Sequence, residues 1–207
     1  YLYSYAAVFG DPLLNPALDP YPDGYLARLA SLGVNGVWLH VVLRTLAPGT
    51  LFPEETGNAA KRLENLKQLV ARARKYGIGV YLYFNEPRAQ DSNFFARHPA
   101  LRGVNEGDLS ALCTSTKAVK QFLREGTRTI FSAVPDLAGF FTITGSENLT
   151  HCWSHGRGAQ CPRCSKRGAG EVIAEVNRLL AEGAWEAQPD AEAIAWDWGW
   201  ADSWVET

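Results

Sequence analysis

Methionine is absent from the 207 residues, and the sequence begins at Tyr1. These features indicate a processed product or a segment of a longer protein, so we expect the rest of a parent chain to be required. A charged start followed by a short apolar run is also lacking, which leaves both cytoplasmic and secreted locations open. No apolar run approaches the roughly 18 to 20 residues of a membrane span, so no membrane association is expected.

An excess of charge of one sign is lacking too. Lys and Arg number 20 against 22 Asp and Glu, which gives a net charge of -2 at pH 7. Because no basic face is available for a phosphate backbone, the sequence argues against nucleic-acid binding. The four cysteines are too few for a disulfide scaffold, and the C-x2-C spacing of Cys161 and Cys164 favours a metal site or reduced thiols.

Apolar residues make up 46% of the chain and charged residues 20%, which is an ordinary globular composition. A chain of this length can bury one sizeable core, so residues 1–207 are expected to form one domain. Aromatic residues are frequent, with seven Trp and eight Tyr. Their flat apolar faces and polar edges suit sugar rings as well as a core, so a carbohydrate is the expected ligand.

Continuous apolar strands alternate with amphipathic helices along the chain. Helices are predicted at residues 23–32, 58–76, 115–133 and 169–188, and strands at residues 1–9, 34–43, 78–84, 137–144 and 191–200. The segment around Phe94, Phe95 and His98 is predicted to be irregular. This order predicts an α/β fold with a parallel sheet covered by helices.

Two architectures fit that order, a (β/α)8 TIM barrel and an open doubly wound sheet. No Gly-rich phosphate-binding turn follows the first strand, whereas polar residues follow nearly every strand, which is typical of the barrel. A full barrel has eight units and about 250 residues. We therefore expect a partial TIM barrel in which only the first five β/α units are present.

The carboxyl ends of parallel strands meet at one edge, so side chains that follow the strands should gather there. The candidates for substrate binding or catalysis at this edge are Asp11, His40, Arg44, Asn85, Glu86, Arg88, Ser146, Glu147, Asn148, Trp196, Asp197, Trp198 and Trp200. His40 lies on an apolar strand, which fits a core histidine as well as a ligand contact. The three tryptophans are the expected sugar contacts.

Three carboxylates in this group are candidate catalytic residues. Glu147 closely follows Gly145 at a buried strand end, where apolar surroundings would raise its pKa and make it a general acid. Glu86 lies in Asn-Glu-Pro, where it would act in catalysis or pair with Arg88. Asp197 lies between two tryptophans, where it would orient a sugar or accept an indole N–H. An exposed loop carboxylate is the simpler alternative for Glu147.

The cysteine-rich segment predicts a structural zinc site. Cys152, Cys161 and Cys164 with His155 would complete a closed tetrahedral set, and His155 is preferred to His151 because His151 adjoins Cys152. Buried reduced thiols are the alternative. Cys113 is expected to pack at a helix start. A bound zinc would stiffen the loop after the fourth strand and hold Glu147 in place.

These residues resemble glycoside hydrolase family 20, the β-N-acetylhexosaminidases, and related uncharacterised bacterial glycosidase-like families. The matching features are Trp38-Leu39-His40, Glu86-Pro87, Gly145-Ser146-Glu147 and Trp196-Asp197. The resemblance implies hydrolysis of glycans that contain N-acetylhexosamine, with Glu147 as the proton donor. The family has Asp where this chain has Ser146, so the resemblance leaves the nucleophile to Glu86, Asp197 or a residue outside this sequence.

Two other functions stay open. Asn-Glu-Pro is also the acid/base signature of a large clan of retaining barrel hydrolases, in which Glu86 would be the acid/base and the nucleophile would lie beyond Thr207. A barrel that binds carbohydrate without catalysis, or serves only as a structural part, is the alternative from a different class.

Overall fold

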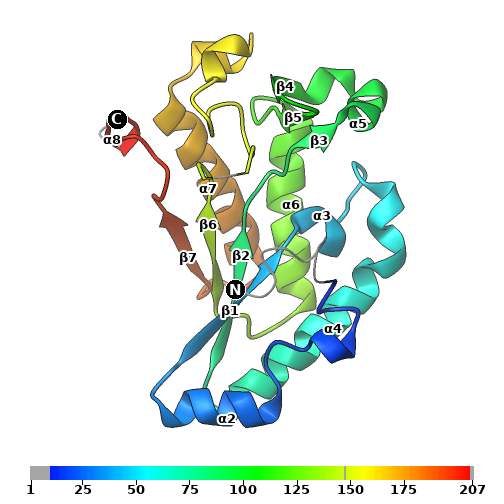
Figure 1. The fold of residues 1–207 in the computed structure, drawn as a ribbon, viewed down its shortest axis with the longest axis vertical. Helices are drawn as coiled ribbons and strands as arrows, with labels where there is room; N and C mark the ends of the chain where they lie inside the picture. The colour runs from blue at the N-terminus through cyan, green and yellow to red at the C-terminus, as the bar shows by residue number, and fades with distance from the viewer. Residues whose placement is uncertain (1–9, 147, 206–207) are drawn as a thin grey trace.

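The computed structural model describes residues 10–146 and 148–205. The strand predicted at residues 1–9 and the acid predicted at Glu147 lie outside these residues. Within them the chain has an α/β fold with one four-stranded sheet, one three-stranded sheet and helices packed around them (Figure 1).

The main sheet is parallel throughout, as the alternation of strands and helices predicts. Its strands, in spatial order, are β1 (Gly36–Val41), β2 (Gly79–Phe84), β6 (Gly139–Ile143) and β7 (Glu192–Trp196). Among the described residues β1 and β7 are the two edges of this sheet, which is therefore an open arc there and not a closed barrel.

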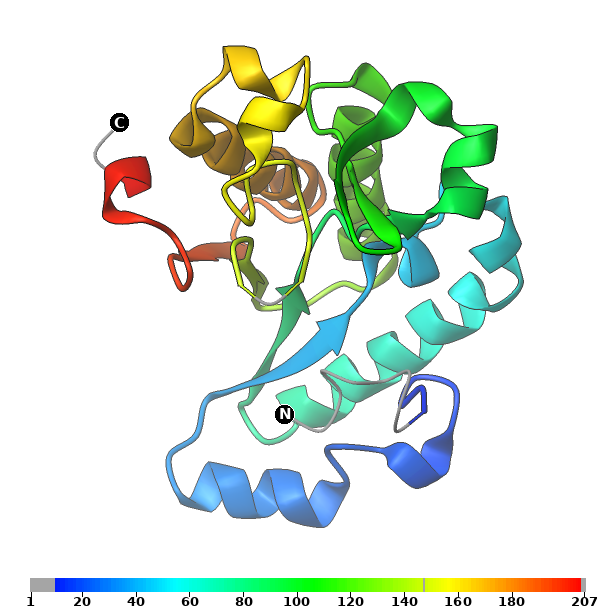
Figure 2. The same cartoon turned by 45° about the horizontal axis from the view of Figure 1, so that its top comes forward.

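Four helices cover one face of the sheet, and all but α2, which precedes β1, come after a strand in the chain (Figures 1 and 2). They are α2 (Asp23–Ser31), α4 (Thr56–Arg74), α6 (Lys117–Ala133) and α7 (Ala169–Ala187). Alternate strand residues such as Leu39, Leu82 and Phe140 are fully or almost fully buried against them in the main hydrophobic core. The four helices predicted from apolar spacing are confirmed to within two residues at every end.

The other face of the sheet has an aromatic row across all four strands. Trp38 packs edge-on against Tyr83, Tyr83 stacks on Phe141 with 4.9 Å between ring centroids, and Phe141 lies 6.2 Å from Trp196. A hollow of about 620 Å³ lies along this face and is lined in part by Trp38, Phe141 and Trp196. In a complete barrel this would be the inner face of the sheet.

A second, antiparallel sheet occupies the segment that was predicted to be irregular. Its strands, in the order β3–β5–β4, are β3 (Gln90–Asp91), β5 (Leu109–Leu112) and β4 (Arg102–Glu106). It follows β2 and lies beyond the carboxyl end of that strand (Figure 1). The prediction of irregular structure was therefore wrong.

The remaining elements are short and lie in the connections. They are η1 (Pro16–Leu18), α3 (Leu43–Leu46), η2 (Pro53–Glu55), α5 (Ser92–Arg97), η3 (Pro99–Leu101), η4 (Gly158–Gln160), η5 (Cys164–Lys166) and α8 (Asp202–Val205). Among the described residues, none of the helices has the length and apolar character needed to cross a membrane.

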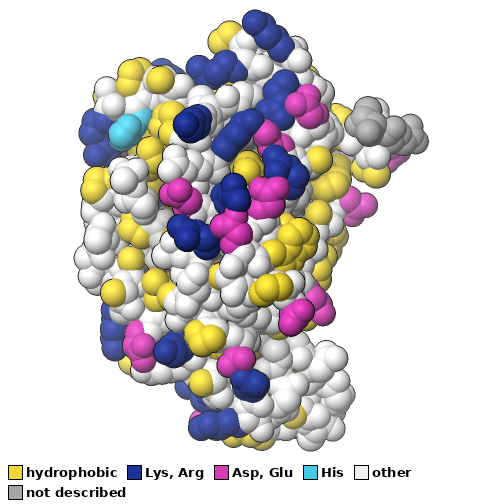
Figure 3. Space-filling view, turned by 180° about the vertical axis from the view of Figure 1, so that it is seen from behind, with side chains coloured by type: hydrophobic (Ala, Val, Ile, Leu, Met, Phe, Trp, Pro, Cys, Tyr) yellow, Lys and Arg dark blue, Asp and Glu magenta, His cyan; other side chains and the backbone are white. Residues whose placement is uncertain are grey.

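Helices α6 and α7 are side by side along the back of the sheet and make the most extensive helix contact. Gly183 makes their close approach possible, because a Cβ there would lie 2.2 Å from the carbonyl oxygen of Arg124. Ion pairs join the same helices, including Lys120 with Glu175 at 2.6 Å and Arg124 with Glu186. Acidic and basic side chains are intermixed on this side of the molecule (Figure 3).

Candidate functional site

The described residues at the ends of the four strands lie at one edge of the main sheet. Register places Val41 beside Phe84, Phe84 beside Thr142, and Ile143 beside Trp196, so the four strands end at similar heights. The last residues of these strands and the residues that follow them therefore share one rim. We call it the strand-end rim and define it by His40, Asn85, Glu86, Ser146, Trp196, Asp197 and Trp198.

Glu86 is buried in this rim and both of its oxygens are engaged. Its side chain is only 2% exposed. Oε1 accepts the backbone N–H of Leu43 at 2.7 Å, and Oε2 accepts the backbone N–H of Arg88 at 2.9 Å. Burial raises the pKa of Glu86, and these hydrogen bonds with the nearby Arg88 and Arg44 charges act in the opposite direction. The geometry suits a carboxylate that fixes two turns.

Asn85 and Arg88 form a brace between two strands. The Nδ2 atom of Asn85 donates to the carbonyl of Ile143 at 2.6 Å, which joins β2 to the end of β6. Arg88 Nη1 donates to Asn85 Oδ1 at 2.9 Å. The pairing expected between Arg88 and Glu86 is thus made through the backbone N–H of Arg88, while its guanidinium binds the amide of Asn85.

Arg44 and His40 are also packed against the protein. Arg44 Nη1 donates to Gln90 Oε1 at 3.0 Å, and its guanidinium lies 5.7 Å from the ring centroid of Phe52. His40 is 8% exposed and its ring is 4.8 Å from that of Tyr83. Arg44 also pairs with Glu55 at 3.7 Å. Both residues are held by neighbouring side chains, which favours a supporting role.

Ser146 and Asn148 flank Glu147, which is outside the described residues, and both are half-buried. The hydroxyl oxygen of Ser146 is shielded from solvent and finds no hydrogen-bond partner in the described part of the chain. Its backbone carbonyl accepts the Nε2–H of His155 at 2.8 Å. The loop after β6 is thus held by a histidine from further along the same connection.

The tryptophans at the end of β7 differ in their surroundings. Trp196 and Trp198 are 48% and 58% exposed, and their rings are tilted with 5.7 Å between centroids. Asp197 lies between them in sequence, is exposed, and borders the hollow along the aromatic row. Trp200 is turned inward and donates its indole N–H to Thr144 Oγ1 at 3.0 Å. Trp196, Trp198 and Asp197 therefore form the accessible part of the rim.

Four buried cysteines form a second site beside the rim. Cys113 follows β5, Cys152 lies in the loop after β6, and Cys161 and Cys164 flank the C-x2-C turn. All four sulfurs lie within 4.8 Å of one another, with Cys113 at 3.7 Å from Cys161 and 3.6 Å from Cys164. A tetrahedron with metal–sulfur distances of about 2.3 Å has edges of about 3.8 Å. This four-cysteine cluster could therefore hold a metal ion.

The fourth member of the cluster corrects the sequence prediction, which chose His155. Both ring nitrogens of His155 are used elsewhere: Nδ1 lies 2.9 Å from the Glu106 carboxylate, and Nε2 faces the carbonyl of Ser146. Cys113 takes the place expected for His155, because β4 and β5 bring it against the loop that follows β6. Gly103 of β4 allows this approach, since a Cβ there would lie 2.5 Å from Cys152 Sγ.

His151 is not part of the four-cysteine cluster. It is fully buried, and burial lowers its pKa to about 3. Its Nδ1 accepts the backbone N–H of Trp153 at 3.2 Å. Its other ring nitrogen, Nε2, is buried and finds no hydrogen-bond partner in the described part of the chain.

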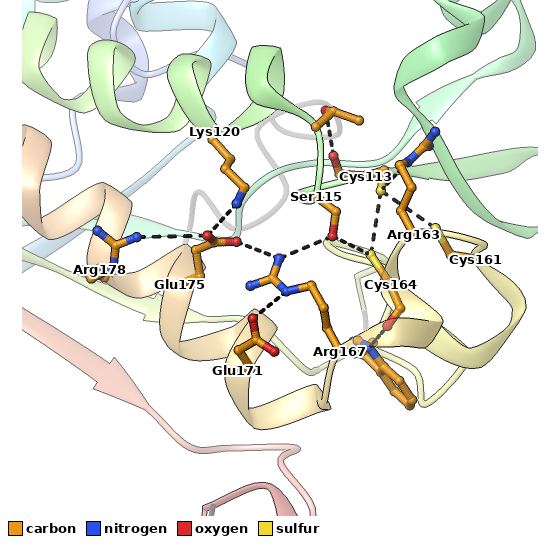
Figure 4. Close-up of polar contacts among 12 residues, drawn as sticks. Cys113, Ser115, Lys120, Cys161, Arg163, Cys164, Arg167, Glu171, Glu175 and Arg178 are labelled. Atoms are coloured by element: carbon orange, nitrogen blue, oxygen red, sulfur yellow. Dashed lines mark hydrogen bonds and ion pairs between the residues drawn. The ribbon is translucent and has the colours of Figure 1, made fainter.

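Hydrogen bonds reach the cluster sulfurs from outside it (Figure 4). Arg163 Nε donates to Cys113 Sγ at 3.2 Å, and Ser115 Oγ lies 3.3 Å from Cys164 Sγ. Contacts from Cys152 and Cys164, together with Arg163, lower the pKa of Cys113 despite its burial. The sequence did not predict that Cys113, Ser115 and Arg163 belong to this site. Cys113 could have been predicted, because the chain has four cysteines and a tetrahedral metal site takes four ligands.

No protein-family model and no curated protein matches this chain. Among solved structures it is similar to the exo-beta-1,4-mannosidase Op5Man5 from Opitutaceae bacterium strain TAV5, with 17% identity and a TM-score of 0.47. The match covers 84% of this chain and 26% of that one, so the chain spans about a quarter of that protein. The hexosaminidase family expected from the sequence finds no support in these comparisons.

Proposed function

We propose that this chain is part of a glycoside hydrolase barrel and contributes the sugar-binding rim. The observation that carries the proposal is the exposed pair Trp196 and Trp198 on either side of Asp197, at the carboxyl end of a parallel strand and beside a hollow of about 620 Å³. Flat apolar rings next to a carboxylate suit the apolar face and the hydroxyl groups of a sugar. In this proposal a longer parent chain supplies the remaining strands.

The catalytic roles follow from which carboxylates are accessible. Glu147 is the proposed general acid on the strength of its sequence position. Asp197 is the better candidate for the second carboxylate, because Glu86 is 2% exposed and accepts two backbone N–H groups. A separation of about 5 Å between the two catalytic carboxyl groups would indicate retention of configuration, and about 6.5 to 9.5 Å would indicate inversion.

The proposed substrates are glycans that contain N-acetylhexosamine or related sugars. Family 20 enzymes use an Asp to steer the substrate's own acetamido group, and Ser146 stands at that position here. A hydroxyl can hydrogen-bond the amide but carries no charge to balance the cationic intermediate. A protein carboxylate is therefore the proposed nucleophile or base.

Saccharide binding and hydrolysis test these roles in the full-length protein. Trp198→Ala should weaken binding to an oligosaccharide panel at least tenfold, whereas Trp185→Ala removes a tryptophan of similar exposure from α7 and should not. Glu147→Gln and Asp197→Asn should abolish hydrolysis of aryl glycosides while retaining binding. Binding without hydrolysis by the unmodified protein would favour the carbohydrate-binding alternative, and equal binding by both Trp variants would overturn the sugar site.

We also propose that the four-cysteine cluster holds a structural zinc ion. Four thiolates close a tetrahedral site and leave no position for substrate, so the ion would cross-link the β4–β5 hairpin to the loop after β6. Elemental analysis of the purified protein should find one zinc per chain, and Cys161→Ser should lose it. Retention of zinc by that variant would place the ion elsewhere.

A further inference from the structure

The metal site proposed above has a charge that the protein must offset. Four thiolates and a divalent cation leave two negative charges, and none of the four cysteines is more than 1% exposed. Burying uncompensated charge is costly unless hydrogen bonds or opposite charges stabilise it. The residues that contact the sulfurs from outside the cluster are therefore the relevant ones.

Arg163 meets this requirement directly. It lies inside the C-x2-C turn, and its Nε donates to Cys113 Sγ at 3.2 Å. A second donor of the same guanidinium, Nη2, binds the carbonyl of Arg102 in β4 at 2.6 Å, which fixes the group over the cluster. None of the ion pairs among the described residues gives Arg163 a carboxylate partner, so the sulfurs are its nearby negative groups.

Ser115 supplies a second donor whose direction is set by Arg167. Arg167 Nη1 lies 3.2 Å from Ser115 Oγ, and because a guanidinium can only donate, the hydroxyl oxygen is the acceptor there. The hydroxyl proton is then directed to Cys164 Sγ at 3.3 Å. Glu171 and Glu175 hold Arg167 in position at 2.7 and 2.8 Å (Figure 4).

We propose that Arg163 and the Arg167-oriented hydroxyl of Ser115 set the metal affinity of the four-cysteine cluster, by hydrogen-bonding Cys113 and Cys164 and offsetting the charge of a tetrathiolate complex. Both are positioning residues: neither binds the ion. The inference rests on the proposed metal site and adds which residues outside the ligand set determine its affinity. Outer contacts of this kind typically change metal affinity by roughly 10- to 100-fold.

Metal titration of the full chain tests the proposal with Zn²⁺ and Co²⁺ as the probes. Arg163→Met and Ser115→Ala should each weaken Zn²⁺ binding by roughly 10- to 100-fold in competition with a chromophoric chelator. Both should also shift the thiolate-to-cobalt charge-transfer band, since the hydrogen bonds change electron density on sulfur. Arg163→Lys should recover part of the affinity. The control is Lys166→Met, which removes an exposed cation from the same loop and should leave affinity and spectrum unchanged.

The outcomes separate the two proposals. If the unmodified protein binds neither ion, or binds without a thiolate charge-transfer band, the metal site itself is wrong. If it binds both ions through sulfur while Arg163→Met and Ser115→Ala keep the parent affinity and spectrum, only the role of these residues is wrong. Should Arg163→Met fail to fold, the same measurements on Ser115→Ala decide the question, because that change removes a single hydroxyl.

Discussion

The carboxylate of Glu86 accepts the backbone N–H of Leu43 across two neighbouring strand ends, at 2.7 Å. Leu43 is the first residue of α3 and lies two residues after the end of β1. The contact therefore fixes the turn after β1 from the end of the neighbouring strand, β2. The sequence Asn-Glu-Pro suggests a catalytic carboxylate. In the structure this carboxylate accepts hydrogen bonds from the backbone N–H groups of Leu43 and Arg88.

Glu86→Gln should lower the stability of the protein. An amide offers one acceptor oxygen where the carboxylate offers two, so one of the N–H groups of Leu43 and Arg88 loses its partner in a buried position. The expected loss in the free energy of unfolding is about 1 to 3 kcal/mol, measured by urea denaturation. Glu54→Gln, an exposed position, is the control. Unchanged stability together with lost hydrolysis would instead support the catalytic reading of Glu86.

The same carboxylate predicts a pH dependence of stability. Burial raises the pKa of Glu86 above its ordinary value of 4.5, so the native state holds the proton more tightly than the unfolded chain. The stability that comes from this protonation is complete below the unfolded pKa and is lost as the pH rises through the folded one. The free energy of unfolding, relative to Glu86→Gln, should therefore increase as the pH falls through that interval. A pH-independent difference would contradict the raised pKa.

Gly183→Ala should destabilise the contact between α6 and α7. The added Cβ would lie 2.2 Å from the carbonyl oxygen of Arg124 and 3.1 Å from the backbone nitrogen of Arg128, so the helices must separate. We expect a loss of about 1 to 3 kcal/mol, as for other overpacked sites. Gly57→Ala in α4 meets no atom within 4 Å and should be neutral or stabilising by up to about 1 kcal/mol. Thermal melts of equal midpoint for the two variants would refute the close packing.

Glu175 predicts a second pH dependence, of opposite sign. Burial opposes its ionisation, but hydrogen bonds from Lys120 and Arg167 outweigh burial and lower its pKa. It therefore contributes stability that is present above the unfolded pKa and is lost as the pH falls through the folded value. Glu175→Gln should cost about 1 kcal/mol at neutral pH, and the difference from the parent should vanish in acid. A difference that persists in acid would show that the variant acts through packing.

Cys113 and His155 can be distinguished as members of the metal site. Cys113→Ser should abolish the four-thiolate spectrum of the cobalt-substituted protein, because it removes a sulfur at the centre of the cluster. His155→Asn should keep that spectrum, although it removes the imidazole that bridges the Glu106 carboxylate and the carbonyl of Ser146. The converse result, a spectrum altered by the histidine variant alone, would restore the ligand set expected from the sequence.

Much of the scaffold could be predicted because it depends on local patterns. Helices α4 and α7 have apolar residues at helical spacing, and β1, β2 and β6 are continuous apolar runs. The second sheet escaped prediction because β3 is two residues long and β4, Arg102–Glu106, mixes charged and apolar positions without clear alternation. Short strands of this kind are specified by their partners more than by their own sequence.

The candidate site divides in the same way. Trp196, Asp197 and Trp198 could be found because their position after a strand predicts the rim. The proximity of Cys113 to Cys152 could not be predicted, because Cys113 is far from Cys152 in the sequence. The β4–β5 hairpin brings the two residues together. The contacts of His155 depend on Glu106 from that same hairpin, so the spacing of cysteines and histidines predicted three members of the four-cysteine cluster and not the fourth.

The four-cysteine cluster has a consequence for the unfolded chain as well. The segment from Cys113 to Cys152 contains all of α6 and β6, so an ion bound to both cysteines would tie one complete helix–strand unit into a closed ring. Closing a long loop lowers the conformational entropy of the unfolded chain more than closing a short one. The cross-link would therefore stabilise the main sheet against unfolding, in addition to stiffening the loop after β6.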